Sequence, residues 1–93
     1  MSIQSFKCTN TKDLFDGIRI KQFRPIESVA MRKLAMLNRA GRLDDLRVPP
    51  GNRLEALKGD RRGQFSIRVN DQFRICFIWT AAGPSEVEIV DYH

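Results

Sequence analysis

Apolar and polar residues alternate through most of the C-terminal third of the chain. In residues 64–69, apolar side chains such as Phe65 and Ile67 fall on one face and polar side chains on the other. Residues 73–80 also place alternate side chains such as Phe73, Ile75 and Phe77 on one face, which is typical of strands with one buried face, and residues 86–93 predict a third strand. The pattern therefore predicts consecutive antiparallel strands joined by short loops.

Burial alone predicts the register of the first hairpin. A three-residue loop, 70–72, pairs Ile67 with Ile75 and keeps the apolar side chains on one face, whereas a two-residue loop mixes the two faces. Because a slip of one residue moves every side chain to the other face, burial favours the three-residue loop. This register places Arg68 directly opposite Arg74.

The second hairpin is predicted with a five-residue loop, 81–85, which pairs Trp79 with Val87 and Arg74 with Tyr92. Arg74 then has a second arginine on one side and a tyrosine on the other. Like charges opposite one another on a sheet are unfavourable. Either these side chains extend into water, or they form an anion site, for which a phosphate is the natural ligand.

Upstream of these strands, the hydrophobic spacing becomes helical. Residues 2–8 predict a short first strand, followed by a short helix with Asn10 or Thr11 as its N-cap and Gly17 at its end. Residues 18–24 place basic side chains around Ile18, Ile20 and Phe23 and are interpreted as a loop.

The main helix is predicted over residues 25–40. Pro25 suits the first helical position, and Gly41 suits a left-handed stop. The apolar residues at helical spacing are Ile26, Val29, Ala30, Leu34, Leu37 and Ala40. This stripe is expected to cover the apolar face of the sheet.

Between the main helix and the first hairpin, residues 42–47 predict one more helical turn, and 49–52 a rigid, proline-containing loop. Residues 54–58 predict a strand, and 59–63 its hairpin connection. The predicted fold class is α+β, with the N-terminal strand and helices packed on one face of a mostly antiparallel sheet and the other face open.

The chain of 93 residues suits a single domain, 1–93, and its net charge is +5. Residues 47–74 hold seven basic and three acidic side chains, whereas 75–93 hold three acids and no lysine or arginine. This basic balance suggests a polyanionic partner, most simply nucleic acid.

Neither a membrane span nor a signal peptide is visible, so a cytoplasmic protein is expected. Cys8 and Cys76 have no metal-ligand spacing and are expected to be reduced thiols.

The candidate chemistry lies on the polar face of the predicted sheet. The single histidine, and the lack of hydrolase or phosphate-loop motifs, set aside metal sites and nucleophile triads. RNA carries its own nucleophile, the 2′-hydroxyl, so its cleavage needs only a base, an acid and cations. Arg68, Arg74 and Lys58 can supply charge, while Tyr92 and His93 can transfer protons. Nearby arginines are expected to lower the pKa of Tyr92. Taken singly, Tyr92 is also compatible with a surface aromatic, and His93 with a frayed terminus.

Two segments, 53–77 and 87–93, resemble the HigB branch of the RelE/ParE toxin superfamily. Residues 32–37 and 49–54 are also similar to the host-inhibition HigB and GraT-like subgroup. The resemblance covers essentially the whole chain. It implies a RelE-like microbial RNase fold and a toxin of a type II toxin–antitoxin system.

The resemblance also implies an activity and partners. Such toxins are ribosome-dependent endoribonucleases that enter the 30S A site and cut mRNA there by 2′-hydroxyl attack, without a metal or cofactor. A HigA-type helix-turn-helix antitoxin neutralises them, and operator DNA is bound only through the toxin–antitoxin complex. No membrane partner is implied.

Carried over by motif, Arg74 matches the phosphate-binding arginine of the family. Asp91, Tyr92 and His93 match its C-terminal catalytic cluster, and Lys58 matches a basic residue of the Leu-Lys-Gly turn. The candidate phosphate-binding residues are Lys58, Arg61, Arg62, Arg68 and Arg74.

Glu55 is a departure from the family pattern, because several HigB proteins have a histidine there. A carboxylate is better suited to accept a proton than to donate one at neutral pH. This leaves two alternatives open beside mRNA cleavage. One is a weakly catalytic or non-catalytic growth inhibitor that binds the ribosome or rRNA and affects ribosome assembly, and the other is a ParE-like gyrase poison.

Overall fold

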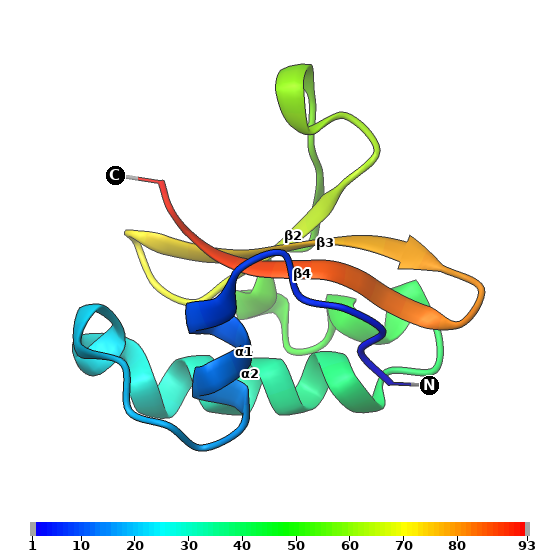
Figure 1. Cartoon of the computed structure of the whole chain (residues 1–93). Helices are drawn as coiled ribbons and strands as arrows, with labels where there is room; N and C mark the ends of the chain where they lie inside the picture. The colour runs from blue at the N-terminus through cyan, green and yellow to red at the C-terminus, as the bar shows by residue number, and fades with distance from the viewer. Residues whose placement is uncertain (1, 93) are drawn as a thin grey trace.

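The computed structural model describes residues 2–92, which form two layers: helices on one side and an antiparallel sheet on the other (Figure 1). The four strands lie in the order β1-β2-β3-β4. The elements are α1 (Thr9–Phe15), η1 (Lys21–Ile26), α2 (Glu27–Arg39), η2 (Leu43–Arg47), η3 (Pro50–Asn52), β1 (Glu55–Ala56), η4 (Gly59–Arg61), β2 (Phe65–Arg68), β3 (Phe73–Thr80) and β4 (Gly83–Asp91). The predicted α+β class is confirmed. None of the helices in this part of the chain is long and apolar enough to cross a membrane.

The core lies between α2 and one face of the sheet. Leu34 and Leu37 of α2 are fully buried, as are Ile67, Ile75 and Phe77 of the strands. These side chains belong to the helical stripe and to the alternating pattern that the sequence shows. Fully burying one such side chain contributes about 1.5 to 3 kcal/mol, so this face supplies much of the driving force for folding.

The ends of α2 differ from the prediction. The helix begins at Glu27, because the turn that contains Pro25 is 3₁₀ and belongs to η1. It ends at Arg39, and the following residue, Ala40, is extended (φ −63°, ψ 129°). Gly41 does not have a positive φ, so the expected left-handed stop is wrong.

The N-terminal segment lies along β4 and forms an isolated parallel bridge there, between Phe6 and Val87, where a strand over 2–8 was predicted. α1 starts at Thr9, before both predicted N-caps, and Cys8 is its N-cap. Thr11 is instead buried inside this helix. Its hydroxyl oxygen accepts a hydrogen bond from the backbone N–H of Ile89 at 3.0 Å. Both predicted N-caps are wrong, because Asn10 and Thr11 lie inside the helix.

The first hairpin has the predicted register. Ile67 pairs with Ile75 and Arg68 with Arg74. The side chain of Asn70 stabilises the loop by accepting the backbone N–H groups of Gln72 and Phe73. The alternation of buried side chains was therefore sufficient to predict this pairing.

The predicted register of the second hairpin is wrong. Arg74 pairs with Val90, not Tyr92, and Trp79 pairs with Pro84, not Val87. Only residues 81–82 connect the strands, because β4 already begins at Gly83.

A β-bulge explains this error. Between the pairs Cys76–Glu88 and Ile78–Ser85, β3 has one residue where β4 has two. Glu86, the first of the two, has a positive φ of 52°, and its N–H donates to the hydroxyl of Ser5 at 2.9 Å. The bulge is therefore stabilised by a segment about 80 residues away in the sequence, which alternation within one hairpin does not reveal.

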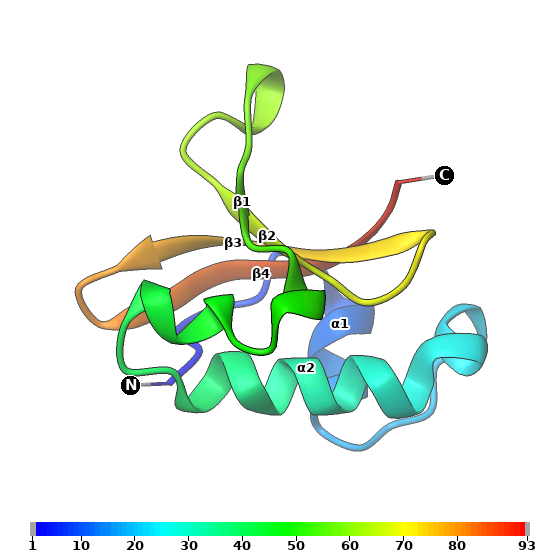
Figure 2. The ribbon, with the colours of Figure 1, turned by 180° about the vertical axis from the view of Figure 1, so that it is seen from behind.

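The β1–β2 hairpin rises from the face of the sheet opposite the helices (Figures 1 and 2). β1 has two residues rather than the five predicted over 54–58, and η4 occupies the tip. Residues 42–47 form the expected helical turn, here the 3₁₀ helix η2. Part of the expected loop over 18–24 belongs to η1.

Candidate functional site

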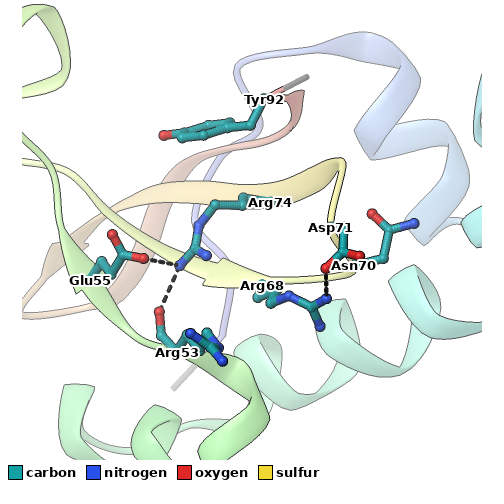
Figure 3. A pocket seen from close by; sticks show the side chains of 7 residues that line it. All are labelled: Arg53, Glu55, Arg68, Asn70, Asp71, Arg74 and Tyr92. Carbon is teal, nitrogen blue, oxygen red and sulfur yellow. Dashed lines mark hydrogen bonds and ion pairs between the residues drawn. The ribbon is translucent and has the colours of Figure 1, made fainter.

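A cleft of about 500 Å³ opens on the sheet face that the helices leave uncovered (Figure 3). It is bordered by the chain before and within β1, by the β2–β3 hairpin and by the residue that follows β4. The residues that line it are Arg53, Glu55, Arg68, Asn70, Asp71, Arg74 and Tyr92. We call this the arginine cleft. It contains four of the nine residues singled out from the sequence.

Arg74 is the most firmly held cation of the arginine cleft. Its Nε–H donates to the hydroxyl of Ser66 at 2.7 Å, and Nη2 donates to the carbonyl of Arg53 at 2.6 Å. Nη2 also lies 3.3 Å from Oε1 of Glu55. The Arg74 side chain is only 12% exposed. Its guanidinium is therefore fixed before any ligand arrives, a requirement for electrostatic stabilisation of a transition state.

Two carboxylates neutralise arginines inside the cleft. Glu55 contacts Arg74, and Asp71 forms an ion pair with Arg68. Both carboxylates are more than half exposed, at 57% for Glu55 and 99% for Asp71. An exposed carboxylate keeps much of its hydration and gains little free energy from an ion pair, so an incoming anion can displace these carboxylates at low cost.

Tyr92 lies on the same face as Arg74, as expected, although it follows β4 and does not pair with Arg74. Its N–H donates to the carbonyl of Gln72 at 2.7 Å, and its hydroxyl lies 3.7 Å from Sγ of Cys76. In Figure 3, the Tyr92 ring and Arg53 lie on opposite sides of the Arg74 guanidinium. The tyrosine therefore borders the place where an anion would meet Arg74.

The expected lowering of the Tyr92 pKa is wrong. Burial, followed by the hydrogen bond with Cys76, raises the pKa of Tyr92 above its ordinary value, and these effects outweigh Arg61 and Arg74, which lower it. Burial likewise raises the pKa of the Cys76 thiol. The phenol therefore remains protonated at neutral pH, which suits a proton donor.

Three predicted phosphate-binding residues lie outside the arginine cleft, on the β1–β2 hairpin: Lys58, Arg61 and Arg62. Arg61 is tied to the sheet, since its Nη1 lies 2.9 Å from Oε1 of Glu88. This hydrogen bond raises the pKa of Arg61. Lys58 and Arg62 are exposed.

Of the predicted C-terminal cluster, Tyr92 lines the arginine cleft and Asp91 does not. Asp91 pairs with Phe73 and accepts the side-chain amide of Gln72 at 3.0 Å. Because successive residues of an extended chain point to opposite faces, Asp91 lies on the side of Phe73, and Tyr92 lies on the side of Arg74. His93 lies outside the described residues.

Three cleft residues were not predicted: Arg53, Asn70 and Asp71. Asn70 and Asp71 follow from the predicted loop 70–72, because that loop borders Arg68. Nothing in the sequence indicated that Arg53 belongs to the cleft, because Arg53 contacts Arg74 through its backbone carbonyl, which every residue has. Across residues 2–92, no three His, Cys, Asp or Glu side chains form a group that could hold a metal ion.

The cleft on an open antiparallel sheet, with helices behind it, fits the class of RelE-like toxins. The family model that matches this chain describes the RelE-like toxin HigB of type II toxin–antitoxin systems, and it covers residues 6–93. The chain belongs to this HigB-like toxin family.

Two individual relatives match shorter stretches. Over 54 residues the chain is 52% identical to Toxin HigB-1 of Vibrio cholerae serotype O1, covering 58% of this chain and 57% of that protein. Over 49 residues it is 43% identical to an uncharacterized protein of Haemophilus influenzae, covering 53% of this chain and 48% of that protein. The match spans about half the length of each relative.

Proposed function

We propose that this protein is a ribosome-dependent endoribonuclease that cuts mRNA in the ribosomal A site and so inhibits translation. The observation that carries the proposal is the placement of a fixed guanidinium, Arg74, and a protonated phenol, Tyr92, in one open cleft. The cleft lies on the uncovered sheet face, where a single RNA strand has access. Membership of the toxin family supports the proposal.

The phosphate site is built on Arg74. Within residues 2–92, its Nη1 has no hydrogen-bond acceptor, whereas Nε and Nη2 are held by the protein. A phosphate therefore binds at Nη1 and displaces Glu55 from Nη2. Arg68 and Arg53 line the same cleft and add positive charge for the neighbouring phosphates.

Glu55 and Tyr92 divide the proton transfers. Once displaced, the Glu55 carboxylate takes the proton of the 2′-hydroxyl, and the 2′-oxygen attacks phosphorus. The bond from phosphorus to the 5′-oxygen breaks, and that oxygen receives the proton of the Tyr92 hydroxyl. The products are a 2′,3′-cyclic phosphate and a 5′-hydroxyl. No step in this scheme requires a metal.

A type II toxin needs an antitoxin, and we propose a HigA-type helix-turn-helix protein as this partner. The toxin would then reach operator DNA only as part of the complex. Co-expression with such a protein is expected to restore growth, whereas an unrelated helix-turn-helix protein is not.

Primer extension on mRNA translated in a reconstituted system tests the nuclease proposal. The wild-type protein is expected to produce cuts at codons in the A site, and Arg74→Ala is expected to remove them. The matched control is Arg47→Ala, because Arg47 also pairs with an exposed carboxylate, Asp44, but lies outside the cleft. Inhibited translation without any cut would favour ribosome binding alone, and inhibited DNA supercoiling would favour a gyrase poison.

A further inference from the structure

A buried amide, Asn52, joins three segments behind the arginine cleft. Its side chain is completely buried, and its Nδ2 donates to the carbonyl of Leu46 at 3.0 Å. Its Oδ1 accepts a hydrogen bond from Nζ of Lys33 in α2. Buried polar groups with all their partners satisfied hold a segment in one conformation. Asn52 therefore fixes the turn η3 against α2 and η2.

Burial affects Lys33 as well. Partial burial is the largest cause of the lowered pKa of Lys33, and the positive charges of Arg32 and Arg68 nearby lower this pKa further. A cation that is partly withdrawn from water at this place needs an acceptor, and the amide oxygen of Asn52 supplies it. The contact with Asn52 thus compensates a partly buried charge as well as ordering the turn.

The residue after Asn52 has an unusual backbone. Arg53 is in the left-handed region (φ 45°, ψ 57°), although it is not a glycine. Its N–H donates to the carbonyl of Pro50 at 3.1 Å, which closes the turn. In this conformation its carbonyl accepts Nη2 of Arg74 at 2.6 Å. Strained backbone of this kind persists only where the surrounding structure enforces it.

We propose that Asn52 and Arg53 are positioning residues that fix the guanidinium of Arg74. Asn52 locks the turn, the turn holds Arg53 in the left-handed region, and the Arg53 carbonyl then sets the direction of the guanidinium. Ser66 holds the other side of the same guanidinium. The purpose of this arrangement, presentation of Arg74 to an RNA phosphate, rests on the proposed function, but the geometry can be tested without RNA.

The test compares Arg53→Gly with Arg53→Val. Both variants lose the arginine side chain, but glycine adopts a positive φ readily, whereas a β-branched residue strongly disfavours it. Hydrogen exchange of the Arg74 Nε–H, followed in ¹⁵N-resolved NMR spectra and assigned with Arg74→Lys, reports the order of the guanidinium. The Gly variant is expected to exchange like the wild type, and the Val variant about tenfold faster or more.

Equal exchange in the two Arg53 variants would overturn the proposal. Should the Val variant not fold, Arg53→Ala takes its place, because alanine also disfavours the left-handed region. Asn52→Ala is expected to speed exchange as the Val variant does, and unchanged exchange would remove Asn52 from the scheme. Melting temperatures identify any variant whose faster exchange comes from general unfolding.

An RNA-binding experiment separates this inference from the proposed function. The probe is a short RNA whose scissile 2′-hydroxyl is replaced by hydrogen, so that binding is measured without cleavage. The Val variant is expected to bind it about tenfold more weakly than the Gly variant, because a misplaced cation loses most of its effect. If Arg74 responds in the NMR spectra but wild-type protein neither binds nor cuts RNA, the positioning role stands and the proposed function fails.

Discussion

The two faces of the sheet bury different kinds of side chain, although the same strands supply both. On the helix-covered face, Ile75 and Phe77 are fully buried in an apolar core. On the open face, Ser66 is equally buried, but it holds the guanidinium of Arg74. Among the described residues, every buried side-chain nitrogen or oxygen has a hydrogen-bond partner. Neighbouring residues of one strand therefore serve stability and the site in alternation, and their substitutions should separate the two properties.

The largest effect is expected on the covered face. Ile75→Ala should lower the free energy of unfolding by about 2 to 5 kcal/mol, because it leaves a cavity in a closely packed core. Urea denaturation measures this change. The fraction that remains folded should bind the non-cleavable RNA as the wild type does. A loss below about 1 kcal/mol would mean that the covered face does not carry the stability assigned to it.

Arg74 lies next to Ile75 in the strand, but Arg74→Lys should affect cleavage more than stability. Lysine cannot reach Ser66, Arg53 and a phosphate together, because it lacks the planar fork of arginine. Cleavage is expected to fall about 100-fold or more, with a smaller change in the free energy of unfolding than Ile75→Ala causes. Arg47→Lys is the control, and equal losses in the two variants would contradict a special role for Arg74.

Tyr92→Phe should reduce cleavage about 100-fold, as expected for removal of a general acid. Binding of the non-cleavable RNA should remain within about twofold of the wild type, because the ring that borders Arg74 is kept. Single-turnover rates and binding isotherms measure the two quantities. Loss of binding with an unchanged single-turnover rate would make Tyr92 a binding residue instead.

Glu55→Gln should strengthen RNA binding by about two- to fivefold, since it removes an exposed carboxylate that competes with the phosphate for Arg74. The cleavage rate of the bound complex should nevertheless fall, because glutamine cannot accept the 2′-hydroxyl proton. Asp44→Asn, which removes a comparable exposed carboxylate next to Arg47, should change neither quantity. Weaker binding by Glu55→Gln would contradict displacement of Glu55 by the phosphate.

The smallest effect concerns the pKa of Tyr92, which can be followed by ultraviolet absorbance because Tyr92 is the only tyrosine. Its pKa should lie above the ordinary value of about 10, and Cys76→Ala should lower it, since Cys76 contributes to the increase. Because the folded-state pKa is raised, the folded chain binds more protons than the unfolded chain in strongly alkaline solution. Stability should therefore decrease as the pH rises from the unfolded towards the folded pKa, and Tyr92→Phe should remove this decrease.

The sequence was sufficient where a pattern repeats at short range. Alternation over 64–69 and 73–80 predicted the pairing of Ile67 with Ile75, because the wrong register would expose the core. The same register brought Arg68 opposite Arg74. Tyr92 was placed on the correct face for a related reason: its predicted and observed positions differ by an even number of residues along the strand.

The sequence was not sufficient where a contact joins distant segments. The bulge at Glu86 depends on Ser5, and the direction of Arg74 depends on a carbonyl of Arg53. Local periodicity carries no record of such contacts, because backbone carbonyls are the same in every residue. The raised pKa of Tyr92 likewise comes from burial in the folded chain, whereas the sequence showed only the arginines nearby.

The sequence alone predicts the two layers, the face of the sheet that the helices cover and the arginines on the open face. It does so because hydrophobic burial acts on every second position of a strand. How Arg74 is held depends on contacts between elements far apart in the chain, such as its hydrogen bond to the backbone carbonyl of Arg53. Hydrogen bonds need angles and distances that only the assembled backbone provides. The basic cleft is therefore visible in the residues, and its fixed geometry arises only on folding.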